Sequence, residues 1–365
     1  MSAKIKSQVK PDYAVAPGET LKEWLEESGM SQVALALRMG RPKKTINEII
    51  SGVSAITPET AFQLENVTGI SASFWNNAES NYRETLARIQ EHEALLGELE
   101  WARAFPYKEL AKRAFVPDIS VHEQKVKNLL RFFSVAGPKQ WESTYVEELR
   151  GAAHGSVAFK SDMHDLSAWL RIGELEASKI DCQAYDEKKF KASLAVIRKH
   201  TAQDVSEQST KLPELCSESG VAFVLVPELP KTHVNGFTRW LSSSKALIQQ
   251  SLRHKRDDHL WFTFFHEAAH ILLHGRKETF LEYNGLDDEK EQEANEWARN
   301  YLIPSRDWNN FVARFNGMFS ETSIRAFARD LEISPSIVLG RLQKENYVPF
   351  NRFHTIFTKL KFVEH

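Results

Sequence analysis

The sequence is poor in cysteine, and it lacks any long uninterrupted apolar run. Only Cys182 and Cys216 occur in 365 residues, and their spacing matches neither a disulfide framework nor a metal site. No apolar run approaches the length that crosses a bilayer, and the polar residues 1–10 lack the apolar centre of a signal peptide. These absences argue against a disulfide-rich secreted domain and a membrane protein, and a cytoplasmic protein is expected.

An excess of charge of one sign is also lacking. The chain has 47 Lys and Arg against 49 Asp and Glu, which gives a formal net charge of -2. Because the whole molecule carries no strong positive potential, any contact with nucleic acid must depend on a local basic face. The length is sufficient for two or three hydrophobic cores.

Two histidines and a glutamate occur together within the apolar stretch at residues 260–273. The apolar side chains there surround a whole helix circumference, which predicts a buried helix. His266 and His270 are separated by four residues, so both imidazoles lie on one face and can bind one metal ion such as zinc. Glu267 lies roughly 100° around the helix and is the expected general base. The pattern alone also fits a helix with two hydrogen-bonded core histidines.

An acidic helix start at residues 291–298 offers a third metal ligand. Catalytic zinc sites have three protein ligands and one open position. Glu291 shares a helix face with small and apolar residues, so it is expected to point inward. Glu293 lies about 200° away and is the alternative ligand. Either carboxylate can instead be a solvated group near a helix N-terminus.

Three short segments before the histidine helix are predicted to be strands, because they are rich in β-branched and aromatic residues and are bounded by Gly, Pro and Ser. They cover residues 220–227, 235–240 and 246–249. We expect residues 237–241 to form an edge strand, with Phe237, Thr238 and Arg239 binding an extended peptide through main-chain hydrogen bonds. An ordinary protected edge is the alternative.

The stretch at residues 261–304 resembles the ImmA/IrrE family of zinc-dependent endopeptidases. It contains His-Glu-Ala-Ala-His-Ile-Leu-Leu-His-Gly and then Glu-x-Glu-Ala-Asn-x-Trp-Ala-x-x-Tyr-Leu-Ile-Pro. The resemblance implies a small zincin-like fold in which His266, His270 and Glu291 hold Zn²⁺. It also implies that zinc lowers the pKa of a water, Glu267 takes the proton, and the hydroxide attacks a peptide carbonyl.

Other positions of this stretch fit the family pattern or depart from it slightly. His274 fits the pattern and is expected beside the ligands instead of among them. The family often has Gly where this chain has Ala269, and Phe where it has Trp297. Both replacements keep size and polarity close, so they do not change the expectation of metal binding.

Residues 17–89 are predicted to form five short helices separated by compact turns. Ser31 is the expected N-cap of a helix at residues 32–38, and Gly40 supplies a tight turn before a helix at residues 43–50. A further helix is expected to start at Thr57-Pro58, an N-cap followed by proline at the first helical position. This spacing fits a helix-turn-helix, although a generic helix pair has similar turns.

The same segment resembles HigA-type antitoxins with a Cro/repressor-like helix-turn-helix. The similar residues are Pro-Gly-Glu at 17–19, Ser31-Gln32, Thr-Ile-Asn-Glu-Ile-Ile-Ser-Gly at 45–52, Ile-Thr-Pro-Glu-Thr-Ala at 56–61 and Phe74-Trp75. The resemblance implies contacts with double-stranded DNA, in which lysines touch phosphates and Thr or Asn reach base edges. The residues implied are Gln32, Lys43, Lys44, Thr45 and Asn47. Arg41-Pro42 departs from the usual apolar residue and Ser or Thr cap.

The remaining segments carry no chemical motif. Residues 1–16 are expected to be a polar arm, residues 90–203 a helical connector that is a packing scaffold or a dimerising or sensing element, and residues 346–365 a tail. Residues 204–345 then form the peptidase-like domain. The expected fold class is α+β, mainly α, with an all-α helix-turn-helix domain, a helical connector and a zincin-like domain with a small sheet.

These patterns together predict a homodimeric regulator of the antitoxin type that binds a DNA operator and carries a zinc-dependent endopeptidase domain. Its substrate would be a repressor, a toxin or the chain itself. One alternative is a non-proteolytic regulator whose zincin-like domain is a sensor or a partner-binding module. Another is hydrolysis of a non-peptide amide by the same zinc chemistry.

Overall fold

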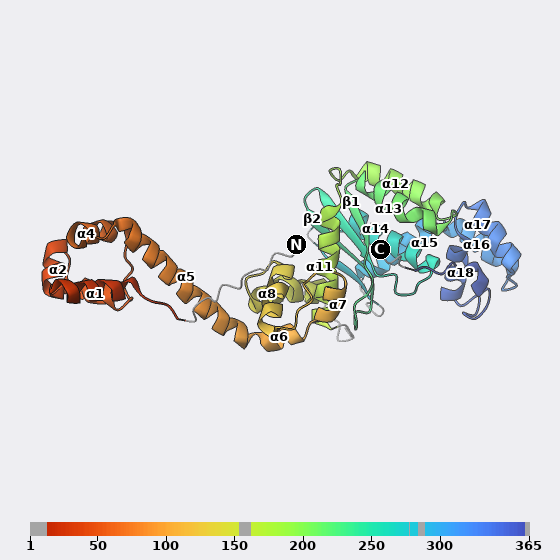
Figure 1. Ribbon diagram of the computed structural model, residues 1–365. Coiled ribbons are helices and arrows are strands. Elements are labelled where there is room, and N and C mark those ends of the chain that lie inside the picture. The colour runs from red at the N-terminus through yellow and green to blue at the C-terminus, as the bar shows by residue number, and fades with distance from the viewer. Residues whose placement is uncertain (1–12, 153–161, 277, 284–288, 362–365) are drawn as a thin grey trace, which may run out of the picture. The chain divides into compact units, whose positions relative to one another are not determined.

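The computed structural model describes residues 13–152, 162–276, 278–283 and 289–361, and it comprises two compact units (Figure 1). The first unit is Met1–Leu99 and the second is Glu100–His365. Most of the expected polar arm, residues 1–12, lies outside the described residues. Within the described part of the chain, no helix is both long enough and apolar enough to cross a membrane.

The described part of the first unit is helical. Its core contains fully buried apolar side chains from successive helices, including Leu21, Leu35, Ile46, Leu64 and Trp75. Because each helix contributes one apolar stripe, the helices enclose a single small core. The helices are α1 (Pro17–Ser28), α2 (Gln32–Met39), α3 (Lys43–Ile50), α4 (Pro58–Thr68) and α5 (Ala72–Gly97).

Helix boundaries in this unit follow the predicted capping residues. The Ser31 hydroxyl accepts a hydrogen bond from the backbone N–H of Ala34, and Thr57 accepts one from Thr60. Gly40 ends α2 with a φ of 64°, a left-handed conformation that glycine adopts without strain. The predictions for α2, α3 and the start of α4 are therefore confirmed.

The last helix of the unit is longer than predicted. α5 continues to Gly97, so the boundary expected at residue 89 falls inside it. No Gly or Pro interrupts the sequence from Ala72 to Leu96, and Glu, Ala and Leu are frequent in its second half. These residues propagate a helix with little energetic cost, so it continues past the point where apolar periodicity weakens.

The second unit begins with helices that belong to the same compact body as the sheet. Their described residues are helical, as predicted for the connector at residues 90–203, and a π-helical turn joins two of them. In chain order they are α6 (Leu99–Arg103), α7 (Tyr107–Lys112), α8 (His122–Phe133), α9 (Pro138–Trp141), the π-helix η1 (Glu142–Val146), α10 (Glu147–Ala152), α11 (Met163–Lys179), α12 (Glu187–His200), the 3-10 helix η2 (Val205–Glu207) and α13 (Gln208–Ser217).

A four-stranded mixed sheet in the described part of this unit has the order β1-β3-β2-β4. Its strands are β1 (Val221–Leu225), β2 (Val234–Ser242), β3 (Lys245–Gln250) and β4 (Phe280–Tyr283). β1 is parallel to β3, whereas β2 is antiparallel to both β3 and β4. The three strands expected before the histidine helix are thus confirmed, and β4 is a further strand that was not predicted.

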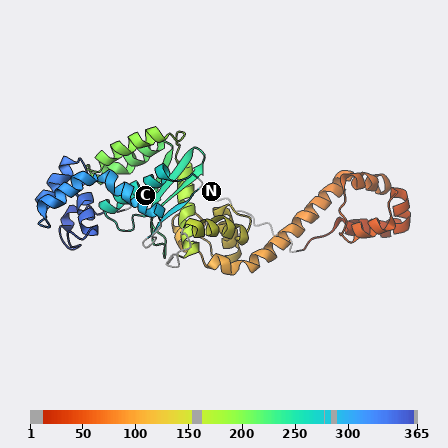
Figure 2. The same cartoon turned by 180° about the vertical axis from the view of Figure 1, so that it is seen from behind.

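Helices cover both faces of the sheet (Figures 1 and 2). α14 (Asp257–Leu273) packs on one face, where Phe223 of β1 meets Phe264 at a ring centroid distance of 5.5 Å. α11 packs on the other face, where the Gln249 side chain donates a hydrogen bond to the Trp169 carbonyl. The sheet is therefore buried on both sides, which explains why its strands are apolar with little alternation.

One prediction about the sheet is wrong. Residues 237–241 were expected to form an edge strand, but β2 lies between β3 and β4. β4 pairs with β2 from Val234 to Thr238, with Phe237 opposite Leu281. No local periodicity indicates this pairing, because β4 is only four residues long and its partner is about 45 residues away.

The end of the chain packs against the same core as α14. Its helices are α15 (Glu289–Leu302), α16 (Ser305–Phe315), α17 (Glu321–Asp330), α18 (Pro335–Lys344) and the 3-10 helix η3 (His354–Ile356). The Ser334 side chain caps the start of α18 by accepting a hydrogen bond from the backbone N–H of Ser336. In the tail, Ile356 is buried in the core. The backbone of Lys359 forms an isolated antiparallel β-bridge with that of Arg256. The described part of the tail is thus a core-packing segment.

Candidate metal centre and helix-turn-helix

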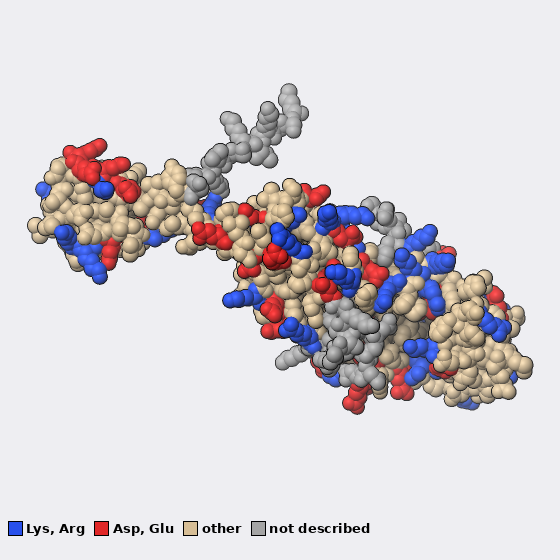
Figure 3. Space-filling model, turned by 90° about the horizontal axis from the view of Figure 1, so that it is seen from below, with Lys and Arg blue, Asp and Glu red and all other residues tan. Residues whose placement is uncertain are grey.

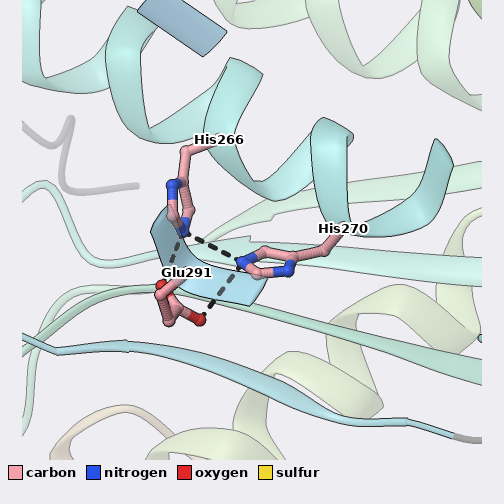
Figure 4. A group of neighbouring side chains, drawn as sticks. All are labelled: His266, His270 and Glu291. Atoms are coloured by element: carbon pink, nitrogen blue, oxygen red, sulfur yellow. Dashed lines mark hydrogen bonds and ion pairs between the residues drawn. The ribbon is translucent and has the colours of Figure 1, made fainter. Parts of the chain in front are cut away.

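Three donor side chains meet beside the sheet, and they come from two helices (Figure 4). α14 places His266 and His270 one turn apart, and α15 brings Glu291 to them. The Nε2 atoms of the two histidines are 3.0 Å apart. The Glu291 Oε2 atom lies 3.0 Å from His266 Nε2, and its Oε1 atom lies 3.3 Å from His270 Nε2.

The spacing of these atoms fits a small divalent cation. Zinc binds imidazole nitrogen and carboxylate oxygen at about 2.0–2.2 Å in tetrahedral geometry, which separates its ligand atoms by roughly 3.3 Å. The separations of 3.0 to 3.3 Å among His266, His270 and Glu291 are close to this value. Two imidazoles and a carboxylate are also the donor types that zinc prefers.

The protonation states of the group suit a cation. Burial lowers the pKa of His270 to about 4, so its ring is neutral at pH 7 and keeps a nitrogen lone pair. Burial alone would raise the pKa of Glu291, but its hydrogen-bonding contacts with His266 and His270 outweigh this and lower it to about 2. The group therefore presents a neutral His270 ring and a negative Glu291 carboxylate.

Glu267, the expected base, is fully buried on the same helix and packs against β2. A Cβ atom added at Gly236 would lie only 2.2 Å from Glu267 Oε1. The Thr238 hydroxyl donates a hydrogen bond of 3.3 Å to the Glu267 backbone carbonyl. Gly236 thus lies at the candidate site, although it was not predicted from the sequence. A glycine inside a strand was the available signal, because it often marks a close backbone approach.

His274 and Glu293 lie next to the group of three donors, His266, His270 and Glu291, which is called the metal group below. The Nδ1 atom of His274 is 2.9 Å from Nδ1 of His270, and its Nε2 atom is 3.3 Å from Glu293 Oε2. Glu293 therefore contacts His274 and stands outside the group of three, whereas Glu291 is inside it. If His270 Nε2 binds a metal, its Nδ1–H donates to His274, which then donates to Glu293.

The expected substrate residues are not open to solvent in this structure. Phe237 is fully buried and Thr238 is 2% exposed. The Arg239 guanidinium is half-buried and contacts two carboxylates, at 3.2 Å from Glu148 and 3.0 Å from Glu174. Phe280 of β4 was not predicted as a site residue; its ring stacks on His270 with centroids 4.1 Å apart.

The residues expected to contact DNA lie at the starts of α2 and α3. Lys43, Lys44 and Asn47 are exposed, whereas Gln32 and Thr45 are half-buried. Pro42 precedes α3 and provides no side-chain cap, as the departure from the usual Ser or Thr suggested. Figure 3 shows acidic and basic side chains in separate small groups on the unit at the left, so local faces of one sign exist despite the nearly balanced total.

Comparisons with known proteins match two separate parts of the chain. Residues 21–75 match the helix-turn-helix family, and residues 251–343 match the IrrE N-terminal-like domain, a peptidase family. Virulence-associated protein A of Dichelobacter nodosus is 36% identical over 78 residues, which are 21% of this chain and 74% of that protein.

Two solved antitoxin structures are similar to part of this chain. One is an addiction module antidote protein of the HigA family from Coxiella burnetii, 28% identical, with 23% of this chain and 94% of that chain covered and a TM-score of 0.22. The other is Pseudomonas aeruginosa antitoxin HigA with higBA promoter, 30% identical, with 24% and 95% covered and a TM-score of 0.22.

Proposed function

Because this chain belongs to the helix-turn-helix family through residues 21–75 and to the IrrE N-terminal-like family through residues 251–343, we propose that it is a DNA-binding regulator with a zinc-dependent endopeptidase domain. The convergence of His266, His270 and Glu291 beside Glu267 carries the enzymatic part of this proposal. The substrate would be a regulatory protein: a repressor, a toxin or this chain itself.

The residues of the group have distinct proposed roles. His266, His270 and Glu291 would hold the cation, and a bound zinc ion supplies Lewis acidity that activates a water and polarises a peptide carbonyl. Glu267 takes the proton of the attacking water and returns it to the leaving amine. Burial of its carboxylate beside Gly236 keeps it in one position and excludes bulk solvent.

The N-terminal unit would direct this activity to an operator in double-stranded DNA. Lys43 and Lys44 are exposed at the start of α3, where they can contact phosphates, and Asn47 is exposed one turn later. Thr45 and Gln32 complete the proposed DNA-contacting set. The match of residues 21–75 to the helix-turn-helix family supports the assignment of this unit to DNA. A homodimer fits an operator with two half-sites.

A second candidate is a regulator that does not cleave proteins. It is favoured by the burial of the metal group, since His266 is 0%, His270 1% and Glu291 7% exposed. A metal there would stabilise a sensor or partner-binding domain, as closed zinc sites do. Hydrolysis of a non-peptide amide would use the same side chains, and it predicts a small substrate in place of a protein.

Replacement of Glu267 by Gln separates these candidates. The change keeps the size of the side chain but removes its basicity, so zinc should remain bound. We expect Glu267→Gln to abolish cleavage of neighbouring regulators or toxins in cells, measured by mass spectrometry of new protein N-termini. Regulation that is unchanged in Glu267→Gln, without any wild-type cleavage, would instead favour the non-proteolytic regulator.

A further inference from the structure

β4 covers the candidate metal group with an aromatic side chain. Phe280 is 3% exposed, and its ring lies nearly parallel to His270, at an interplanar angle of 15°. The same ring approaches His274 with centroids 4.9 Å apart. The three donor residues are themselves less than 10% exposed, so they are closed to an extended peptide in this structure, and Phe280 of β4 packs directly on one of them.

The strand with which β4 pairs, β2, also passes Glu267. β4 pairs with β2 at Gly236, Phe237 and Thr238. Gly236 packs against the Glu267 carboxylate, and Thr238 donates to the Glu267 backbone. This edge of β2 therefore passes Glu267, and a segment of the chain itself lies along it and places Phe280 on His270.

One carboxylate of the helical region contacts both the start of β4 and β2. Glu148 of α10 accepts a hydrogen bond of 2.8 Å from the hydroxyl of Thr279, the residue before β4. It also forms an ion pair with Arg239 of β2. Arg239 has a second partner in Glu174 of α11, so loss of Glu148 leaves the arginine paired but removes the hydrogen bond from Thr279.

We propose that β4 is an internal competitor for the substrate and that Glu148 is the latch that keeps it on β2. This inference depends on the proposed endopeptidase function. When the latch opens, an extended peptide replaces β4 by pairing with residues 234–238, because main-chain hydrogen bonds bind a strand without demanding one sequence. An aromatic side chain in the place of Phe280 would stack on His270, so the preferred substrate is an extended segment with an aromatic residue.

This proposal gives α10, one of the helices that precede the sheet, a role in controlling β4. Glu148 lies on α10, which directly continues the π-helical turn η1. A partner or ligand that shifts α10 withdraws the acceptor from Thr279. Loss of this one hydrogen bond to a charged group shifts the equilibrium between paired and released β4 on the order of tenfold.

Hydrogen exchange of the full chain tests the latch without depending on catalysis. Thr279→Val and Glu148→Ala should each raise amide exchange of residues 278–283 and 234–238 by about tenfold. Exchange in β1 and β3 should stay as in the wild type. Thr279→Ser, which keeps the hydroxyl, and Glu147→Ala, at the exposed neighbour of Glu148, are the matched controls. Unchanged exchange of β4 in both latch variants would overturn the inference.

A reversible cross-link tests the competition. Phe237 and Leu281 are direct partners in the antiparallel pair, a position at which cysteines can form a disulfide. In Phe237→Cys/Leu281→Cys, oxidation should block cleavage of an unfolded test protein such as casein and slow zinc removal by a chelator at least tenfold. Reduction should restore both rates. Equal zinc removal in the oxidised and reduced forms would contradict the inference.

The two tests distinguish failure of the latch from failure of the proposed function. If exchange and zinc removal respond as expected while no form cleaves casein or an aromatic-rich peptide, the latch stands and the endopeptidase proposal fails. If the oxidised protein cleaves as fast as the reduced protein, the enzyme stands, and β4 is not a competitor for the substrate.

Discussion

The Nδ1 atom of His274 lies 2.9 Å from the Nδ1 atom of His270, on the side of the ring opposite to the nitrogen that meets His266 and Glu291. This contact fixes the orientation of the His270 ring. It also leads on to Glu293, whose carboxylate is 3.3 Å from His274 Nε2. A histidine that binds metal usually needs such a partner to hold its tautomer and position.

The first prediction concerns this outer contact. His274→Ala should weaken zinc binding by about 10- to 100-fold, because His270 loses its hydrogen-bond partner. His274→Asn, which can still accept from His270, should lose less. Competition with a zinc chelator measures the affinity, and far-ultraviolet circular dichroism of the zinc-free protein checks the fold. An affinity equal to wild type in His274→Ala would exclude the proposed positioning role.

The second prediction concerns the close approach of β2 to the expected base. Gly236→Ala should reduce proteolysis by at least tenfold while zinc stays bound, because the new Cβ would lie 2.2 Å from Glu267 Oε1 and must displace that carboxylate. Gly97→Ala is the control, since a Cβ there meets no atom within 4 Å. Activity retained in Gly236→Ala would show that Glu267 is not held by this contact.

The third prediction concerns pH and stability. Burial lowers the pKa of His259 to about 3, and the positive charges of His254, Arg256 and Lys344 act in the same direction. An unfolded histidine has a pKa of about 6.5, so below this pH the unfolded chain binds one more proton than the folded one. The free energy of unfolding should therefore fall as the pH falls from 6.5 towards 3.

Replacement of His259 by Gln isolates that contribution. The variant should lose less stability than the wild type between pH 7 and pH 4.5, by up to about 3 kcal/mol. Urea denaturation at the two pH values provides the comparison, and the carboxylates that titrate in both proteins cancel. Parallel pH dependence of the two proteins would show that His259 contributes nothing to the acid sensitivity.

The fourth prediction concerns the helix-turn-helix. Lys43→Ala/Lys44→Ala should weaken DNA binding at all sequences and reduce the salt dependence by about one unit for each lysine that binds a phosphate in the wild type. Asn47→Ala should instead relax discrimination between operators. Lys22→Ala, at an exposed position of α1, is the control. Binding to promoter fragments at several salt concentrations provides the measurement, and wild-type salt dependence in the double variant would contradict it.

The sequence predicted those features whose pattern lies within a few neighbouring residues. His266 and His270 were identifiable because four-residue spacing on an apolar helix is a local pattern, and Glu291 followed from its place among Ala294 and Ala298. Ser31 and Thr57 were correctly predicted as caps for the same reason, since capping involves residues three positions apart.

Contacts between distant segments could not be predicted in this way. β4 gains its stability from pairing with β2, so nothing in four residues indicated it. The pairing of Arg239 with Glu148 and Glu174 joins residues separated by 91 and 65 positions, and a lone arginine in a strand carries no sign of its partners. The same limit explains why Phe280 was missed at the site.

The zinc content of the purified full chain tests the central claim most directly. We predict about one zinc ion per chain in the wild type and in Glu293→Gln, and none above background in Glu291→Gln, measured by inductively coupled plasma mass spectrometry. Glu291 lies within the group of three donors and Glu293 outside it, so the two variants differ only in that position. Absence of zinc from the wild type, or an equal zinc content in all three proteins, would contradict the account.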